Sequence, residues 1–301
     1  MTAQQRPPSS SDDALARIDT VLCDLDGVVW LGRGAIPGAV EAIESIRAGG
    51  RRVLFVTNNS VTTERQLVDA LGSIGVPATG DVVTSAMAAA ALVEEGSRVL
   101  VAGEAGIVEA VERRGGEAVP NDGASPTGGV DAVLVGLHRD FDYGRLARAS
   151  SAIRAGARYI ATNDDATFPT QTGFDPGGGS IVAAVTTASG VEPVIAGKPY
   201  RPMAACIQRM LIGPGSRSAS GARPSPSHVL MVGDRPSTDG RFAEVLGCPF
   251  ALVRTGVVAP GGPPVAGTPV DYDEADLAAI ARLLEAAPMD RAELDDPDTV
   301  G

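Results

Sequence analysis

The chain has 301 residues, of which 44% are hydrophobic and 21% charged, as in a globular protein with room for two domains. Its net charge of −12 argues against nucleic acid or an anionic membrane surface as the main partner. With only two histidines, a histidine-based triad or zinc site is not expected. Three cysteines without metal-type spacing, no apolar run of membrane-spanning length and no signal-peptide segment at the start predict a cytoplasmic protein with reduced thiols.

Strand-like apolar runs alternate with helical stretches along most of the chain. Buried-type strands are predicted at 20–23 and 53–56, and helices at 39–48 and 63–74. This order implies a parallel sheet covered by helices, and therefore the α/β class. The pattern continues with strands at 98–102, 130–135, 159–161, 191–196, 228–232 and 250–253, and with helices at 107–114, 143–155, 180–189, 199–211 and 273–287.

Three segments lie outside this pattern. Residues 213–227 are rich in Gly, Ser, Pro and Arg, which predicts an exposed mobile loop. The stretches 1–14 and 288–301 are predicted to be disordered tails.

Two aspartates, Asp24 and Asp26, directly follow the first predicted strand. They can project toward one site at the carboxyl edge of a parallel sheet, which is where open α/β sheets bind ligands. Carboxylates this close repel each other unless they share a cation or a proton. A pair of this spacing by itself is more typical of a solvated turn, so the other strand ends decide the interpretation.

Polar residues also follow the second strand, as Thr57-Asn58-Asn59. Their hydroxyl, amide and backbone N–H groups could hold phosphate oxygens, although Ser60 or Thr62 could equally cap the following helix. Past the strand that ends at Val232, Asp234 and Asp239 place further carboxylates at a strand end. A simple turn would explain any one of these segments, but polar residues at four strand ends, the one before Lys198 included, are hard to attribute to turns alone.

Lys198 is the only lysine, whereas the other 24 of the 25 basic residues are arginine. Lysine is a compact point charge on a flexible stem, and arginine does not replace it at a tight site. Between a strand at 191–196 and a helix that begins at Pro199, free backbone N–H groups favour an anion. A lone surface lysine is the alternative; a phosphate site is favoured by this position.

Together these segments resemble the haloacid dehalogenase superfamily of aspartyl phosphatases. The similarity is to subfamily IIA, which includes phosphatases of phosphoglycolate, glycerol phosphate, pyridoxal phosphate and nitrophenyl phosphate. It covers roughly residues 18 to 285, and the four motifs occur in the family's order as Asp24-Leu25-Asp26-Gly27, Thr57-Asn58-Asn59, Gly197-Lys198-Pro199 and Gly233 to Asp239. The resemblance implies a Rossmann-like parallel-sheet core of residues 15–84 and 195–287, with an α/β cap domain inserted at 85–194.

The resemblance also implies roles for the motif residues. Asp24 would be the nucleophile that forms an aspartyl-phosphate, and Asp26 the acid that protonates the leaving oxygen and later activates water. Lys198 would bridge Asp24 and the phosphate. Donors to the phosphoryl group would come from Thr57, Asn58 and Asn59.

A magnesium ion is implied as cofactor. Its ligands would be Asp24, the backbone carbonyl of Asp26 and Asp234, while Asp239 would orient this shell. The physical argument agrees, because a carboxylate cannot readily attack a dianionic phosphate unless positive charge offsets the repulsion.

In the cap, the segment that contains Asn163, Asp165 and Phe168 is expected to face the phosphate site, although a polar turn is an equal alternative. The resembled pyridoxal-phosphate phosphatases carry histidine near Phe168, which disfavours that substrate. The expected substrate is a small phosphorylated metabolite, first glycerol 3-phosphate or 2-phosphoglycolate. Sugar phosphates, nucleoside monophosphates and pyridoxal phosphate stay open, as does a non-catalytic phosphometabolite-binding protein. A homodimer through the cap is a further expectation.

Overall fold

The computed structural model describes residues 11–32, 34–123, 129–170, 173–212, 225–258, 261–262 and 267–289. The chain divides into two compact units: unit 1 contains residues 1–54 and 211–301, and unit 2 contains residues 55–210. The predicted cap boundaries at 85 and 194 stay a prediction. Of the predicted tails and mobile loop, residues 1–10, 213–224 and 290–301 lie outside the described residues, while Ser11–Ala16 form helix α1.

Unit 1 contains four parallel strands in the order β15, β14, β13 and β1. Their bounds are Tyr272–Glu274, Phe250–Val253, Val229–Gly233 and Thr20–Cys23. Every residue of β1, β13 and β14 is buried, which explains why these strands are continuous apolar runs rather than alternating ones.

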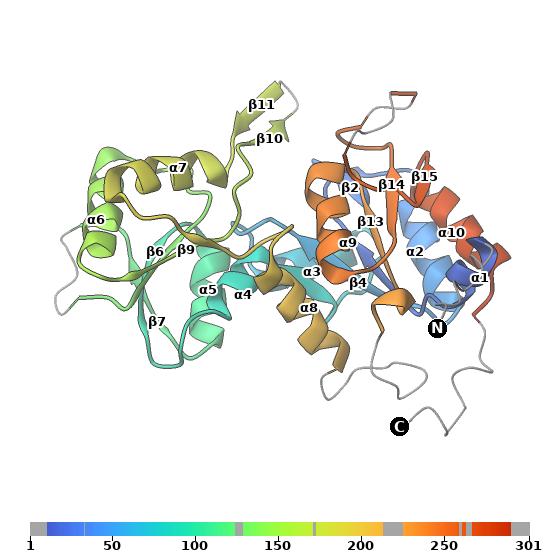
Figure 1. Cartoon of the computed structure of the whole chain (residues 1–301), viewed down its shortest axis with the longest axis horizontal. Coiled ribbons are helices and arrows are strands. Elements are labelled where there is room, and N and C mark those ends of the chain that lie inside the picture. Colours follow the sequence, from blue (N-terminus) through green and yellow to red (C-terminus); the bar gives the residue numbers. More distant parts are fainter. Residues whose placement is uncertain are drawn as a thin grey trace, which may run out of the picture. The chain divides into compact units, whose positions relative to one another are not determined.

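Helices cover the strands of unit 1 (Figure 1). Helix α10 (Leu277–Ala286) packs against α2 (Ala39–Ala48) and α1, and α9 (Arg241–Leu246) packs against β13. Smaller elements complete the unit: the hairpin of β2 (Trp30–Leu31) and β3 (Gly34–Ala35), the 3₁₀-helix η1 (Pro226–His228) and the π-helix η2 (Pro236–Gly240).

Strand β4 (Arg52–Thr57) runs from unit 1 into unit 2, where it pairs in parallel with β5 (Val82–Thr84). Between them lies helix α3 (Glu64–Ser73), which begins at a capping box: the side chain of Thr63 accepts from the backbone N–H of Gln66, and the Gln66 side chain accepts in return. Helix α4 (Ser85–Ala90) follows β5, and α8 (Arg201–Ile212) follows strand β12 (Val194–Ile195).

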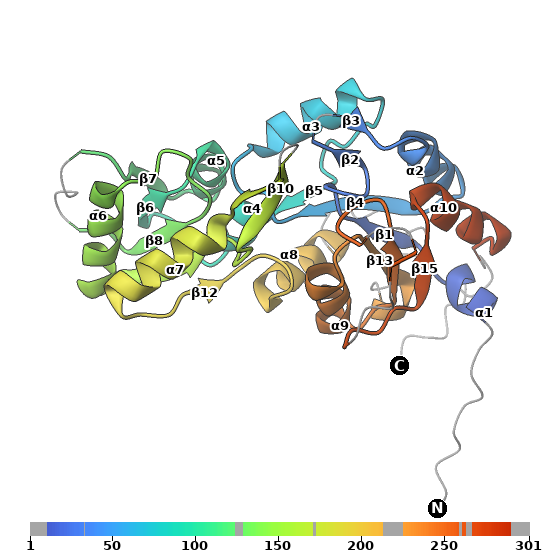
Figure 2. The same ribbon diagram turned by 90° about the horizontal axis from the view of Figure 1, so that it is seen from above.

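The second sheet of the protein lies wholly in unit 2 and has five parallel strands in the order β12, β9, β8, β6 and β7. Their bounds are Val194–Ile195, Arg158–Ala161, Ala132–Val135, Arg98–Ala102 and Glu117–Pro120. The helices of this sheet are α5 (Ala105–Arg113), α6 (Tyr143–Arg154) and α7 (Gly178–Ser189), and α6 packs against α7 (Figure 2). A separate antiparallel hairpin joins β10 (Thr167–Thr170) to β11 (Gly173–Pro176).

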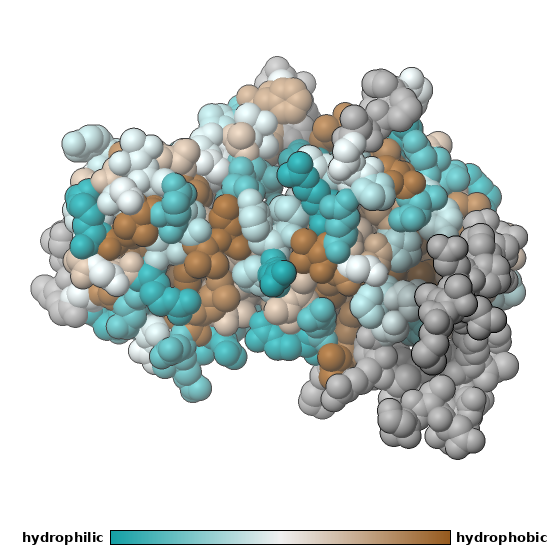
Figure 3. Space-filling model, viewed as in Figure 1, coloured by the Kyte–Doolittle hydropathy of each residue, from teal (hydrophilic) through white to brown (hydrophobic). Residues whose placement is uncertain are grey.

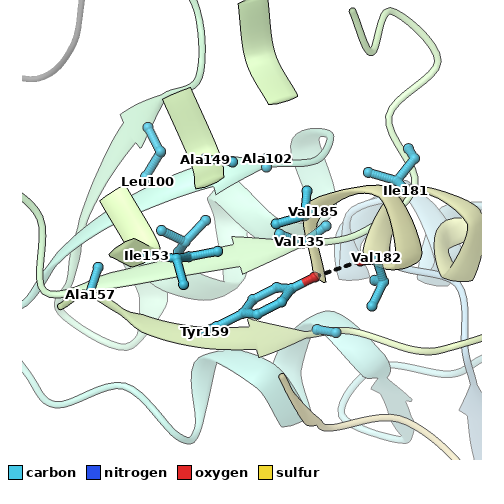
Figure 4. Close-up of a cluster of buried hydrophobic side chains, with 12 residues drawn as sticks. Leu100, Ala102, Val135, Ala149, Ile153, Ala157, Tyr159, Ile181, Val182 and Val185 are labelled. Atoms are coloured by element: carbon cyan, nitrogen blue, oxygen red, sulfur yellow. Dashed lines mark hydrogen bonds between the residues drawn. The ribbon is translucent and has the colours of Figure 1, made fainter. Parts of the chain in front are cut away.

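Alternate residues of this sheet form a hydrophobic core with α6 and α7 (Figure 4). Leu100 and Ala102 of β6 and Val135 of β8 point to the same face, as the two-residue period of a strand requires. Tyr159 brings a hydroxyl into this core, where it donates to the carbonyl of Val182 at 2.9 Å. Burial raises the pKa of Tyr159 to about 12.

Most predicted elements of the described residues are present. Apart from the two short hairpins, the strands pair in parallel, which confirms the α/β class. Three elements differ from the prediction. The strand expected at 191–196 is limited to Val194–Ile195. The helix expected from Pro199 begins at Arg201, because the N–H of Tyr200 donates to the carbonyl of Gly197 at 2.8 Å and closes a turn first. The helix expected from Asp273 begins at Leu277, where Asp276 caps it, and Asp273 belongs to β15.

Hydrophobic residues on the face shown in Figure 3 form small separate groups with hydrophilic residues between them. Large exposed side chains such as Leu31, Tyr143 and Phe174 belong to different elements. Among the described residues, no helix combines the length and the hydropathy needed to cross a membrane.

Candidate active site

Three carboxylates meet at the ends of two neighbouring strands in unit 1. Asp24 follows β1 and Asp234 follows β13, and these strands pair so that Cys23 lies opposite Val232. One carboxylate oxygen each of Asp24, Asp234 and Asp239 lies within 4.8 Å of the other two. We call these three residues the acidic group. Because three ionised carboxylates at this spacing repel one another, the group fits a hard divalent cation.

Glycines make room for Asp234. A β-carbon added at Gly27 would lie 2.5 Å from Asp234 Oδ2, and one at Gly256 would overlap the same oxygen. Gly27 also has φ +84°, a backbone conformation that L-residues rarely adopt. The N–H of Val257 donates to Asp234 Oδ2 at 2.6 Å, so a backbone donor fixes the buried carboxylate in the space that the two glycines leave.

The other two carboxylates are held by the backbone at their own strand ends. The N–H of Leu25 donates to Asp24 Oδ1 at 2.8 Å, and the N–H of Arg235 donates to Asp239 Oδ2 at 3.1 Å. A side chain at Gly233 would overlap the Asp239 carboxylate, so the end of β13 has to be glycine.

The Asp26 carboxylate is exposed and lies outside the acidic group. Its Oδ1 accepts from the indole Nε1 of Trp30 at 3.0 Å. Trp30 is not among the site residues predicted from the motifs; it is the only tryptophan of the chain and stands four residues after Asp26. Its indole N–H limits the orientations open to the Asp26 carboxylate.

In unit 2, Asn58 forms hydrogen bonds with three other segments of the chain, which contain Ser85, Asn163 with Asp165, and Lys198. Its Oδ1 accepts from the N–H of Lys198 at 2.8 Å, and its Nδ2 donates to the Lys198 carbonyl and to Asp165 Oδ2, both at 3.0 Å. The Asn58 carbonyl accepts from Ser85 Oγ at 2.7 Å and from Asn163 Nδ2 at 2.9 Å. We call these five residues the asparagine–lysine group. Lys198 itself is 2% exposed.

Thr57 and Asn59 shape the turn between β4 and α3. Thr57 is buried, and its Oγ1 accepts from the N–H of Asn59 at 3.0 Å. Asn59 Oδ1 accepts from the N–H groups of Val61 and Thr62, at 2.9 and 3.1 Å. The sequence suggested Ser60 or Thr62 as the helix cap; the cap is Thr63, because its side chain is the one placed to accept from Gln66.

Phe168 is a half-buried residue of β10, paired with Asp175 across the hairpin. It is not a member of the asparagine–lysine group. The sequence predicted that Asn163, Asp165 and Phe168 of the cap domain face the phosphate site. Of these three, Asn163 and Asp165 form hydrogen bonds with Asn58.

Comparison with known proteins identifies the family. A model described as haloacid dehalogenase-like hydrolase matches residues 21–117, and one described as HAD-hydrolase-like matches residues 195–271. The D-glycerol 3-phosphate phosphatase of Mycobacterium tuberculosis is 37% identical over 287 residues, which are 92% of this chain and 76% of that protein. The chain belongs to subfamily IIA of the haloacid dehalogenase superfamily.

Other relatives of this superfamily member agree. A 5'-nucleotidase of Bacillus subtilis is 38% identical over 240 residues, which are 78% of this chain and 87% of that protein. The solved structure of the M. tuberculosis glycerol phosphate phosphatase in complex with magnesium superposes with a TM-score of 0.68 at 37% identity, over 81% of this chain and 70% of that chain. The predicted fold, a Rossmann-like parallel-sheet core with an inserted α/β cap, and the predicted enzyme class, a phosphatase, are both confirmed.

Proposed function

We propose that this haloacid dehalogenase family member is a magnesium-dependent phosphomonoester hydrolase that acts on a small phosphorylated metabolite through an aspartyl-phosphate. The observation that carries the proposal is the acidic group at the ends of β1 and β13. Its donors are all carboxylate oxygens, the ligand type that magnesium prefers. The crystallised relative with magnesium supports this choice of ion.

Asp24 is the proposed nucleophile. Its carboxylate attacks phosphorus, the bond to the ester oxygen breaks, and that oxygen takes a proton from Asp26. Water then attacks the phosphorus of the aspartyl-phosphate and passes a proton back to Asp26. The bond from the Asp24 oxygen to phosphorus breaks, which releases inorganic phosphate and restores the carboxylate. The exposed position of the Asp26 carboxylate, held by Trp30, suits a group that exchanges protons twice in each cycle.

When bound, magnesium would offset negative charge on the nucleophile and the phosphate. Asp24, Asp234 and the backbone carbonyl of Asp26 would hold it. Asp239 would orient this shell, a role supported by the bond that its Oδ2 already accepts from Arg235. Lys198, the Thr57 hydroxyl, the backbone N–H of Asn58 and the Asn59 side-chain amide would act on the phosphoryl oxygens.

The first candidate substrates are glycerol 3-phosphate and 2-phosphoglycolate, and the identity to a glycerol 3-phosphate phosphatase supports the former. Nucleoside monophosphates are the second candidate, because the 5'-nucleotidase has a similar identity of 38%, over a shorter stretch of 240 residues. We further propose a homodimer formed through the cap and a cytoplasmic location. None of the three cysteines forms a disulfide, which agrees with a reducing compartment.

Phosphate release from p-nitrophenyl phosphate, with magnesium and after its removal by a chelator, tests the proposed reaction. Asp24→Asn should lower kcat by at least about 10³-fold, since the nucleophile is lost while the fold is kept. A panel of glycerol 3-phosphate, 2-phosphoglycolate and nucleoside monophosphates then ranks the substrates by kcat/KM. Full activity in Asp24→Asn, or activity that survives complete magnesium removal, would contradict the mechanism.

A further inference from the structure

The main chain of Lys198 is held on both sides by a single side chain. The Asn58 amide accepts from the N–H of Lys198 at 2.8 Å and donates to the carbonyl of the same residue at 3.0 Å. The two residues are 140 positions apart in the sequence. Such a two-point contact restrains the Lys198 backbone, and with it the point from which the four-carbon stem of the side chain extends.

The same contact uses up the donors of Asn58. A primary amide has two N–H hydrogens, and Asn58 Nδ2 donates to two acceptors, the Lys198 carbonyl and Asp165 Oδ2. No side-chain N–H is left for a phosphoryl oxygen. We infer that the Asn58 side chain is a positioning residue that fixes the only lysine of this chain, rather than the phosphate donor that the family motif suggests.

Asp165 determines which way the Asn58 amide points. An ionised carboxylate can only accept hydrogen bonds, so the NH₂ end of the amide has to face Asp165. The amide oxygen then faces the Lys198 N–H. The backbone carbonyl of Asn58 accepts separately from Ser85 and Asn163, so both the backbone and the side chain of Asn58 are restrained.

Gly197 completes the arrangement. A β-carbon at this position would lie 2.6 Å from Asn58 Oδ1 and 2.5 Å from the carbonyl of Thr162. The residue before Lys198 is therefore glycine because the Asn58 amide approaches the backbone there. The positioning role rests on the proposed function, in which the Lys198 amine must meet a phosphate; the contact itself does not.

The single lysine makes the contact directly observable. Labelling with [¹⁵N]lysine gives one backbone amide signal, that of Lys198, whatever the enzyme's activity. In Asn58→Ala this signal should shift, and its hydrogen exchange should speed up by at least about tenfold, because the acceptor of its N–H is lost. Asp165→Asn, which leaves the amide free to turn, should give a smaller change and serves if Asn58→Ala does not fold.

Asn121→Ala is the matched control. Asn121 is also a buried asparagine of unit 2 that bonds in both directions, since its Nδ2 donates to the Arg145 carbonyl at 3.1 Å and its Oδ1 accepts from Arg148 Nε at 3.1 Å. This variant should leave the Lys198 amide unchanged. The inference is overturned if Asn58→Ala leaves the Lys198 amide shift and exchange as they are in the wild type.

Kinetics test whether the contact positions Lys198 for catalysis. Asn58→Ala should lower kcat by about 10- to 100-fold, since a misplaced group loses its transition-state contact, while KM changes by less than about threefold. In a Lys198→Ala background the same substitution should cost less than about threefold more, because Asn58 acts through Lys198. A full additional loss in that background would instead indicate direct phosphate contact and overturn the role. Absence of turnover in the wild type would refute the proposed function, and the amide signal would still decide the contact.

Discussion

At the scale of single residues, the acidic group depends on residues that have no side chain. Asp234 is buried between Gly27 and Gly256, and neither position has space for a β-carbon. The contact with the N–H of Val257 requires this close approach. Local backbone shape therefore determines where a carboxylate can stand beside Asp24.

Gly256→Ala should displace Asp234 and weaken magnesium binding. We expect the magnesium concentration for half-maximal activity to rise by at least about tenfold, since one ligand is lost from the shell. The rise in Tm that magnesium gives the wild type should shrink in parallel. Gly72→Ala is the control: its β-carbon meets nothing within 4 Å in α3, so the magnesium requirement should stay unchanged and stability should rise by about 0.5 kcal/mol. An unchanged magnesium requirement in Gly256→Ala would show that Asp234 is not a ligand.

At the scale of elements, β9 serves two purposes. Its alternate residues Tyr159 and Ala161 pack against α6 and α7, and the segment after it carries Asn163 and Asp165. The Tyr159 hydroxyl donates to the Val182 carbonyl in α7, which ties the strand to the helix. A rigid strand thus supports the side chains that hold Asn58.

Tyr159→Phe should destabilise the protein by about 1 kcal/mol at pH 8, the usual value of one lost hydrogen bond. The folded pKa of Tyr159 is about 12, whereas an unfolded tyrosine ionises near pH 10. Between pH 10 and pH 12 the tyrosine keeps its proton in the folded state and loses it in the unfolded state. The wild type therefore loses stability as pH rises, whereas the phenylalanine variant has no hydroxyl to ionise and does not. The stability advantage of the wild type in urea unfolding should accordingly shrink above pH 10 and change sign before pH 12, because a pKa shift of about two units is worth about 2.7 kcal/mol, more than the hydrogen bond.

A constant difference over that pH range would mean that Tyr159 ionises normally in the folded state. Tyr143→Phe provides the control, because Tyr143 is 85% exposed and its substitution should change stability by less than about 0.5 kcal/mol.

At the scale of the whole molecule, unit 1 joins stretches from opposite ends of the sequence. The Arg51 guanidinium is 4% exposed and donates to the carbonyls of Ile18, Leu15 and Ala287, at 3.0, 3.4 and 2.6 Å. Burial lowers its pKa. Since a guanidinium presents five N–H donors in a fixed fork, it can serve several carbonyls at once.

Arg51→Met should lower the free energy of unfolding by roughly 2–4 kcal/mol, because three buried carbonyls lose their charged donor. Urea unfolding measures the loss, and kcat per folded molecule should not change. Arg139→Met, which breaks only the exposed pair with Glu104, should cost less than about 1 kcal/mol. Equal losses in the two variants would show that the Arg51 contacts do not stabilise the fold.

Local patterns in the sequence were sufficient to predict β1, α2 and β6. A strand buried on both faces is a continuous apolar run, and the apolar residues of a surface helix recur with a period of 3.6 residues. They were not sufficient for β15 or the hairpin of β10 and β11. The three residues of β15 are half exposed and polar, and both hairpin strands lack an alternating pattern. Such short elements form because a neighbouring strand supplies hydrogen bonds.

The sequence by itself determined the family, the chemistry of the motifs and the strand ends that carry Asp24, Thr57, Lys198 and Asp234. These follow from residue types at fixed spacing beside apolar runs. The tertiary structure decided which partners those residues have: Asp239 beside Asp24, Trp30 on Asp26, and Asn58 on both sides of Lys198. The reason is physical, since a hydrogen bond depends on distance and direction in space, and residues 58 and 198 become neighbours only when the chain folds.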